Sequence, residues 1–153
     1  MNKTSRQENK YQKLLDLEKH IVNPNLSINK NNAEKLYFKA LDFNKKYSNN
    51  KHKESVYVLA AKCSDGLNWN TKNIAVIDKL LAEFPLSNNC PNYLYNKGKI
   101  YEEKLNNIEK AKIIYTDIIK KYPDSEIAKN LVDYLIFRSK TNQDQLQFLN
   151  KKD

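Results

Sequence analysis

The sequence predicts an all-α protein, a short solenoid in which about seven helices form about three successive pairs. Composition and pattern both support this class. Glycine occurs twice and proline four times in 153 residues, so the residues that tight hairpin turns require are scarce. Apolar residues recur instead at intervals of three and four, which is typical of helices with one buried face.

The segment 111–122 shows the helical pattern clearly. Ile114, Ile118 and Tyr122 recur every four residues and form one apolar face. Pro123 then ends the helix, because proline cannot continue the backbone hydrogen bonding. The same pattern predicts helices at about 7–21, 31–47, 53–67, 72–84, 91–105, 108–122 and 125–138. Apart from a longer loop at 23–27, their connections are short, so neighbouring helices are expected to be antiparallel.

The two ends of the chain are polar, and we expect them to lie outside the helical domain. The predicted organisation is a polar tether at 1–10, a repeat domain at 11–140 and a polar tail at 141–153, frayed or with one loose turn. The first ten residues contain no hydrophobic stretch of the kind that a secretory signal needs. No apolar run approaches the roughly 18 residues of a membrane-spanning helix.

Comparison of the chain with itself reveals a repeat. The aromatic residues Tyr47, Phe84 and Tyr122 lie 37 and 38 residues apart, and each follows an amphipathic helix. Two helices per unit at a period near this value are typical of a helical solenoid, in which each unit packs against its neighbours.

The unit from Asn92 to Ser125 resembles the tetratricopeptide repeat. That family's pattern has a small residue and an aromatic in the first helix, an alanine and a large residue in the second, and then proline. These positions correspond to Gly98, Tyr101, Ala111, Tyr115 and Pro123, with one extra residue in the turn 105–108. The two earlier units match less well, since the alanine position of one and the proline position of the other are replaced. The resemblance implies a right-handed solenoid that needs no cofactor and binds a protein or peptide partner.

Gly98 lies in the middle of a predicted helix, where glycine costs up to about 1 kcal/mol relative to alanine. Such a glycine is expected where the partner helix passes so close that a Cβ atom would clash. Ala111 is the expected facing position, with Tyr101 and Tyr115 filling the space between this helix pair and its neighbours. A simple kink in the helix is the alternative.

Three segments, 33–37, 94–103 and 109–125, further resemble tetratricopeptide lipoproteins of bacterial cell envelopes. That resemblance implies a location in the bacterial periplasm or at the periphery of the outer membrane, with the cytoplasm as the alternative. Members of this group begin with a lipidated cysteine and a short polar tether. Residues 2–10 are similar to such a tether but contain no cysteine, so membrane contact is expected only through a lipid anchor outside this sequence.

The formal net charge of +9 raises the alternative of a basic, all-helical protein that binds nucleic acid. Against it, Arg6 and Arg138 are the only arginines, and arginine is the residue that recognises phosphate and guanine through paired hydrogen bonds. The lysines are spread along the chain and accompanied by many asparagines, which indicates a compositional bias. Binding of nucleic acid would require these lysines to gather on one face.

The histidines and cysteines do not form a recognisable catalytic or metal-binding motif. His20 and His52 lie far apart and are expected to be solvated. Cys63 and Cys90 are predicted to be reduced. In a repeat stack they would be offset by roughly 13 Å along the helix direction, whereas a disulfide tolerates about 7 Å between Cα atoms. Cys63 is expected to be a small core residue.

Solenoid repeats align their first helices along a concave surface, which is the usual place for a peptide ligand. Tyr95, flanked by Lys62 and Lys99, is the best single candidate for an anchor residue, with ordinary core packing as the alternative. The full set of candidate partner-binding residues is Val58, Lys62, Asp65, Asn92, Tyr95, Lys99, Glu102, Lys129 and Asp133. The sequence therefore predicts a protein-interaction scaffold.

Catalysis and self-assembly would each require a feature of their own. An enzyme would need a convergent acid–base pair, which the sequence does not display. A structural or oligomerising protein would use the apolar flank 134–137 on the last predicted helix. That flank would favour a homodimer if no other segment covers it.

Overall fold

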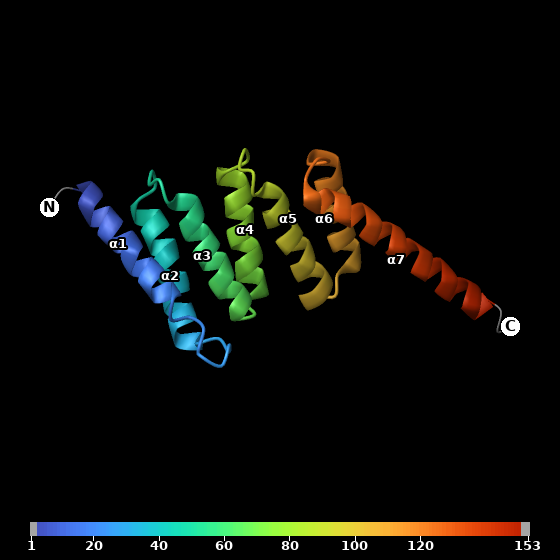
Figure 1. Cartoon of the computed structure of the whole chain (residues 1–153), viewed down its shortest axis with the longest axis horizontal. Coiled ribbons are helices and arrows are strands. Elements are labelled where there is room, and N and C mark those ends of the chain that lie inside the picture. The colour runs from blue at the N-terminus through green and yellow to red at the C-terminus, as the bar shows by residue number, and fades with distance from the viewer. Residues whose placement is uncertain (1–2, 151–153) are drawn as a thin grey trace. The chain divides into compact units, whose positions relative to one another are not determined.

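The computed structural model describes the backbone of residues 3–150 and the side chains of residues 4–140 (Figure 1). Within this part of the chain, every regular secondary-structure element is a helix. An isolated antiparallel β-bridge joins Val22 to Ile28. The prediction of an all-α fold is confirmed. The contacts between Cα atoms divide the chain into two compact units, Met1–Leu86 and Ser87–Asp153.

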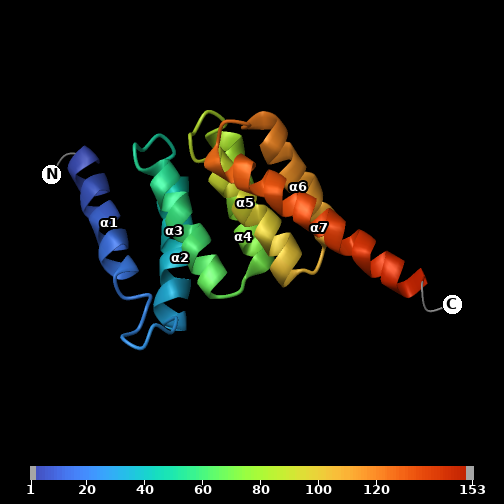
Figure 2. The same ribbon diagram turned by 45° about the vertical axis from the view of Figure 1, so that its right-hand side comes forward.

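In its described residues, the first unit contains α1 (Lys3–Glu18), α2 (Lys30–Lys46), α3 (Lys53–Gly66) and α4 (Asn70–Glu83). Each helix packs against the next, and neighbours run in opposite directions (Figure 1, Figure 2). The antiparallel order that the short connections predict is confirmed for this unit.

Small residues bring α2 and α3 close together. Ala33 and Ala40 on α2 and Ala60 on α3 are completely buried, and their short side chains let the two helix backbones approach. Leu36 is also completely buried, and burial of such a side chain stabilises the unit by about 1.5–3 kcal/mol. Cys63 is 1% exposed, which confirms its predicted place as a small core residue.

The second unit contains α5 (Cys90–Lys99), a π-helical turn (Ile100–Lys104), α6 (Ile108–Lys121) and α7 (Glu126–Asn150). The apolar face predicted for the segment 111–122 is confirmed, because Ile114 and Ile118 of α6 are buried. They form one core with Tyr115 of the same helix and with Ala128 and Leu131 of α7. In this unit α7 packs against both α5 and α6 (Figure 2).

Two predicted helix boundaries are wrong. α1 begins at Lys3, so residues 3–10 are helical and do not form the tether expected at 1–10. α7 continues to Asn150 instead of ending near residue 138, so the tail expected at 141–153 contains the last turns of a helix. No glycine or proline interrupts the segment 126–150, and nothing in its sequence therefore forces the helix to stop.

Glu8 makes tertiary contacts from the first turns of α1. Its carboxylate lies 3.4 Å from the ammonium group of Lys51 and 3.0 Å from Nε2 of His52. The ring of Tyr11 stacks on the ring of His52, with 3.7 Å between ring centres. His52, expected to be solvated, is thus largely covered, with 18% of its side chain exposed. These contacts tie the first turns of α1 to the loop between α2 and α3.

Candidate functional site

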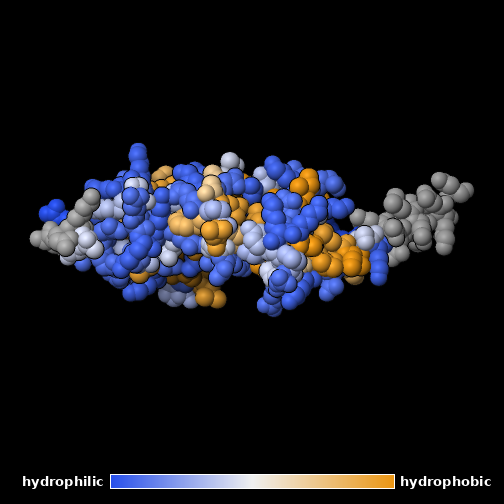
Figure 3. Space-filling model, turned by 90° about the horizontal axis from the view of Figure 1, so that it is seen from above, coloured by the Kyte–Doolittle hydropathy of each residue, from blue (hydrophilic) through white to orange (hydrophobic). Residues whose placement is uncertain are grey.

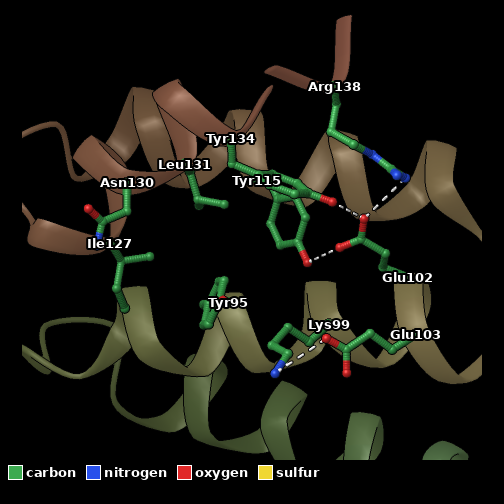
Figure 4. A pocket seen from close by; sticks show the side chains of 10 residues that line it. All are labelled: Tyr95, Lys99, Glu102, Glu103, Tyr115, Ile127, Asn130, Leu131, Tyr134 and Arg138. Carbon is green, nitrogen blue, oxygen red and sulfur yellow. Dashed lines mark hydrogen bonds and ion pairs between the residues drawn. The ribbon is translucent and has the colours of Figure 1, made fainter. Parts of the chain in front are cut away.

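A pocket of about 600 Å³ opens in the second unit between α5, α6 and α7 (Figure 4). The side chains that line it are Tyr95, Lys99, Glu102, Glu103, Tyr115, Ile127, Asn130, Leu131, Tyr134 and Arg138. Pockets that bind small ligands have volumes of about 300–1,000 Å³. The space is therefore large enough to hold a few side chains of a bound peptide.

The π-helical turn Ile100–Lys104 shapes one wall of this pocket. The N–H of Leu105 donates to the carbonyl of Ile100 at 3.1 Å, five residues earlier, where an α-helix would bond four residues earlier. The N–H of Asn107 then donates to the carbonyl of Tyr101 at 2.7 Å and closes the end of the helix. The sequence predicts the extra residue in the turn 105–108, whereas the structure accommodates it earlier, in the wider helical turn Ile100–Lys104.

The carboxylate of Glu102, on this turn, is the centre of the hydrogen bonds in the pocket (Figure 4). The hydroxyl of Tyr115 donates to Oε2 at 2.9 Å, and the hydroxyl of Tyr134 donates to Oε1. The guanidinium of Arg138 lies 3.5 Å from Oε1. Because 17% of the Glu102 side chain is exposed, these donors replace much of the water that burial removes. Glu102 thus links the end of α5 to both α6 and α7.

Three tyrosine rings lie next to one another along the pocket. The ring centre of Tyr115 is 6.0 Å from that of Tyr95 and 6.0 Å from that of Tyr134, which it meets edge to face. Burial raises the pKa of Tyr115 and of Tyr134, and the hydrogen bond that each donates to Glu102 raises it further. Both hydroxyls therefore stay protonated, and able to donate, at neutral pH.

Gly98 faces the ring of Tyr115. A Cβ atom at position 98 would lie 2.3 Å from Cε1 and 2.9 Å from Cδ1 of that ring, far inside van der Waals contact. The predicted clash is confirmed, but the atoms that cause it belong to Tyr115 and not to Ala111. The ring cannot move aside easily, since Tyr115 is 2% exposed and its hydroxyl is bonded to Glu102.

The charged side chains of the pocket are already paired with one another. The ammonium group of Lys99 lies 3.4 Å from Oε1 of Glu103, one turn further along the chain, and Arg138 pairs with Glu102. The two ion pairs balance, so the lining has no net charge. On the opposite wall α7 contributes aliphatic side chains, so the pocket combines a polar and an apolar side.

The structure brings three of the predicted partner-binding residues together in this pocket, namely Tyr95, Lys99 and Glu102. Tyr95 is half-buried, so it packs against Tyr115 and faces the pocket as well. The remaining candidates of the second unit are exposed and lie outside the lining: Asn92, Lys129 and Asp133.

The candidates Val58, Lys62 and Asp65 belong to α3 of the first unit. Val58 is half-buried, whereas Lys62 and Asp65 are exposed. The ammonium group of Lys62 lies 2.8 Å from Oε1 of Glu18. Their part in partner binding, including the flanking of Tyr95 by Lys62, stays a prediction.

The side of the pocket formed by α7 was missed. Sequence reasoning selects Lys129 and Asp133, but the lining residues are the next ones along the chain, Asn130 and Tyr134. One residue turns an α-helix by about 100°, so the predicted face points away from the pocket. A signal was present, because Ile127, Leu131, Tyr134 and Arg138 recur at intervals of four, three and four on one helix face.

No cluster of three or more His, Cys, Asp or Glu side chains suited to a metal ion occurs within the described residues. None of the described helices is both long enough and apolar enough to cross a membrane. Cys63 and Cys90 are buried and are not joined in a disulfide, as predicted. Burial raises the pKa of Cys63 to about 12, which makes this thiol a poor nucleophile at neutral pH.

Residues 93–125 match the family model described as the tetratricopeptide repeat. Searches of curated proteins and of solved structures found no match. The matched segment runs from α5 to the turn after α6, so it includes the π-helical turn and Tyr115. The match identifies one tetratricopeptide repeat within the chain, and this repeat forms two walls of the pocket.

Proposed function

We propose that this chain is a non-catalytic scaffold that binds a segment of a partner protein in the pocket of the second unit. The tetratricopeptide match itself suggests a protein-interaction scaffold. The observation that carries the proposal is the pocket, in which three tyrosines and two aliphatic residues surround about 600 Å³ beside paired charges.

The lining favours an apolar or aromatic side chain presented by an extended peptide. Ile127 and Leu131 supply an apolar wall, and Tyr95 adds a large ring with a polar tip, a combination common at protein interfaces. A strongly charged peptide would have to separate an existing ion pair, which costs free energy. Asn130, exposed among the lining residues, can bond to the peptide backbone.

Selection of peptides against the immobilised full chain would provide a ligand for the test. The affinity of the selected peptide is then measured by fluorescence anisotropy. Tyr95→Ala is expected to weaken binding about tenfold or more, because buried interface tyrosines often contribute more than about 1 kcal/mol. The matched control, Lys129→Ala with Asp133→Ala, removes two exposed side chains of α7 outside the pocket and is expected to change affinity less than about twofold.

The opposite result would contradict the proposal that the partner binds in this pocket. If the control lost affinity while Tyr95→Ala kept it, the partner would bind the face of α7 that carries Lys129 and Asp133. Urea unfolding of each variant checks that a lost affinity does not reflect a lost fold.

We also propose the bacterial envelope location that the resemblance implies. It is supported by the similarity of the segments 33–37, 94–103 and 109–125 to envelope lipoproteins. Fractionation of cells that express the natural gene, followed by detection with an antibody, tests it. Recovery with the periplasm or the outer membrane supports the proposal, and recovery with the cytosol rejects it.

A homodimer through α7 is a separate proposal. Of the predicted flank 134–137, Tyr134 and Leu135 pack against the core of the second unit. Ile136 and Phe137 are 48% and 68% exposed, and Val132 on the same helix is 39% exposed. Figure 3 shows an apolar (orange) surface on the second unit, next to the residues drawn in grey at the right. Exposed apolar surface of this kind often marks an interface, and a second copy of α7 offers a matching apolar surface.

A further inference from the structure

In the first unit, α1 and α2 form a groove of about 590 Å³. Five lysines line it, Lys10 and Lys13 from α1 and Lys35, Lys39 and Lys46 from α2, and we call it the lysine groove. All five are exposed. The pocket of the second unit shares none of these residues, so the two surfaces can be tested separately.

The bottom of the lysine groove is apolar. Leu14 and Phe43 are 4% exposed, and Leu17 and Tyr47 are half-buried beside them. Leu14 and Phe43 are already covered, so a bound partner would gain hydrophobic contact from the exposed parts of Leu17 and Tyr47, in addition to its attraction to the lysines. The groove thus suits a partner with both charged and apolar groups.

The carboxylates that line the lysine groove neutralise only part of its positive charge. Of the two carboxylates that line it, Asp16 is already paired with Lys19 at 2.9 Å, which leaves Asp42. Among the described side chains, no ion pair joins any of the five lysines to a carboxylate. Lys35 and Lys39 lie one helical turn apart and repel each other, which an acidic partner would relieve.

The spacing of the lysines indicates the shape of the partner. Lysines three, four and seven residues apart on a helix are about 4.5, 6 and 10.5 Å apart along its axis. Acidic residues one or two turns apart on a third helix, lying along the groove, have the same spacing. Nucleic acid fits less well, because it would set its phosphates against Asp42 and leave the apolar bottom unused.

We propose that the lysine groove binds an acidic, amphipathic helix of a partner protein. The apolar face of that helix packs on the exposed parts of Leu17 and Tyr47, and its glutamates or aspartates meet the lysines on both walls. This is the helix-in-groove mode of recognition with charge complementarity added.

The test uses the full chain and a labelled synthetic peptide of about 18 residues, long enough for five helical turns, with leucines on one face and glutamates beside them. Two matched peptides replace either the glutamates by glutamine or the leucines by serine. Fluorescence anisotropy is expected to show binding of the first peptide. Each replacement is expected to weaken binding about tenfold, since charge and apolar contact both contribute.

The matching protein variant is Lys35→Glu with Lys39→Glu. Its control is Lys112→Glu with Lys120→Glu, which reverses two exposed lysines on α6 of the second unit and changes the net charge equally. The groove variant is expected to lose about tenfold or more in affinity, and the control less than about twofold, because exposed charges act mainly at short range in salt. Should the groove variant unfold, Lys13→Glu with Lys46→Glu reverses two other lysines of the groove.

Three outcomes would overturn the proposal. Equal losses in the groove variant and the control would mean diffuse attraction to a basic surface. Equal binding of the leucine and serine peptides would mean that the apolar bottom takes no part. Tighter binding of a single-stranded oligonucleotide or of vesicles that contain phosphatidylglycerol, lost in the groove variant, would mean that the groove serves nucleic acid or a membrane surface.

Discussion

Gly98 and Tyr115 act as a pair, because the ring of one occupies the space that a side chain at the other would need. Gly98→Ala is expected to destabilise the second unit by about 1–3 kcal/mol, the usual cost of overpacking a core. The better helix propensity of alanine recovers up to about 1 kcal/mol of this loss. Urea unfolding, compared with that of the unaltered chain, measures the difference.

Gly66 provides the matched control. A Cβ atom there would lie 2.8 Å from Cδ1 of Ile28, which is the flexible end of a half-buried side chain. Ile28 can shift, so Gly66→Ala is expected to change the free energy of unfolding by less than about 1 kcal/mol. Equal destabilisation at both glycines would show that the ring of Tyr115 is not the obstacle.

Tyr57 gives the first unit a predictable sensitivity to alkaline pH. It is 6% exposed and donates a hydrogen bond to Oε1 of Glu83 at 2.8 Å. Burial, and then this bond, raise its pKa to about 12, whereas an unfolded tyrosine ionises near a pKa of about 10. The folded state therefore keeps a proton that the unfolded state loses. The stability from Tyr57 is complete below about pH 10 and is lost as the pH rises towards 12.

Tyr57→Phe is expected to lower the free energy of unfolding at about pH 8 by about 1 kcal/mol, the usual net value of one hydrogen bond. The difference in free energy of unfolding between the variant and the unaltered chain should become smaller at about pH 11, because phenylalanine has no proton to lose. Urea unfolding at both pH values measures the gap, and lysine ionisation affects both proteins alike. A gap of the same size at both would contradict the raised pKa.

At the scale of elements, the π-helical turn determines where Glu102 points. Deletion of Lys104 removes one residue and is expected to restore a regular α-helical turn, the length that the tetratricopeptide pattern has. The fold should persist, with a change of less than about 1–2 kcal/mol, because the lost hydrogen bonds to Glu102 are partly replaced by water. Peptide affinity is expected to fall about tenfold, since the pocket wall changes shape.

Urea unfolding and fluorescence anisotropy with the selected peptide separate the two effects of this deletion. Retained affinity would show that the wider turn is not needed for binding. Loss of the fold would show that the π-helical turn is a structural requirement of the second unit.

Some elements could be predicted from the sequence because local pattern determines them. The apolar period of α6 and the proline after it are contained in one short segment, and the helix forms where expected. The π-helical turn could not be located in this way. An extra residue is visible in the sequence, but the turn brings Glu102 to Tyr134 and Arg138, which lie 32 and 36 residues away and are not part of any local pattern.

The candidate site was predictable to the same limited extent. The repeat pattern selects Tyr95, Lys99 and Glu102, because the sequence aligns their helix with the tetratricopeptide repeat. On α7 the same repeat frame selects Lys129 and Asp133, one residue before the lining residues Asn130 and Tyr134, and one residue turns a helix by about 100°. The contacts that Glu8 on α1 makes with Lys51 and His52 join residues more than forty positions apart, which periodicity does not detect.

At the scale of the whole molecule, exposed apolar residues of α7 bear on the assembly state. Sedimentation of the chain from about 5 to about 500 µM is expected to show a monomer–dimer equilibrium, because association depends on protein concentration. Ile136→Glu should shift it to the monomer. The control Ile113→Glu alters an isoleucine on α6 that is 63% exposed and should leave it unchanged. A monomer at every concentration would rule out the dimer.

The two cysteines give each unit its own chemical reporter. Cys63 lies in the first unit and Cys90 in the second, and each is 1% exposed. A thiol reagent can reach such a side chain only when its surroundings open. The rate at which each cysteine is alkylated, followed by mass spectrometry of the proteolytic peptides, therefore reports the opening of its own unit. Unaltered protein could then show whether a bound peptide protects one unit, the other or both.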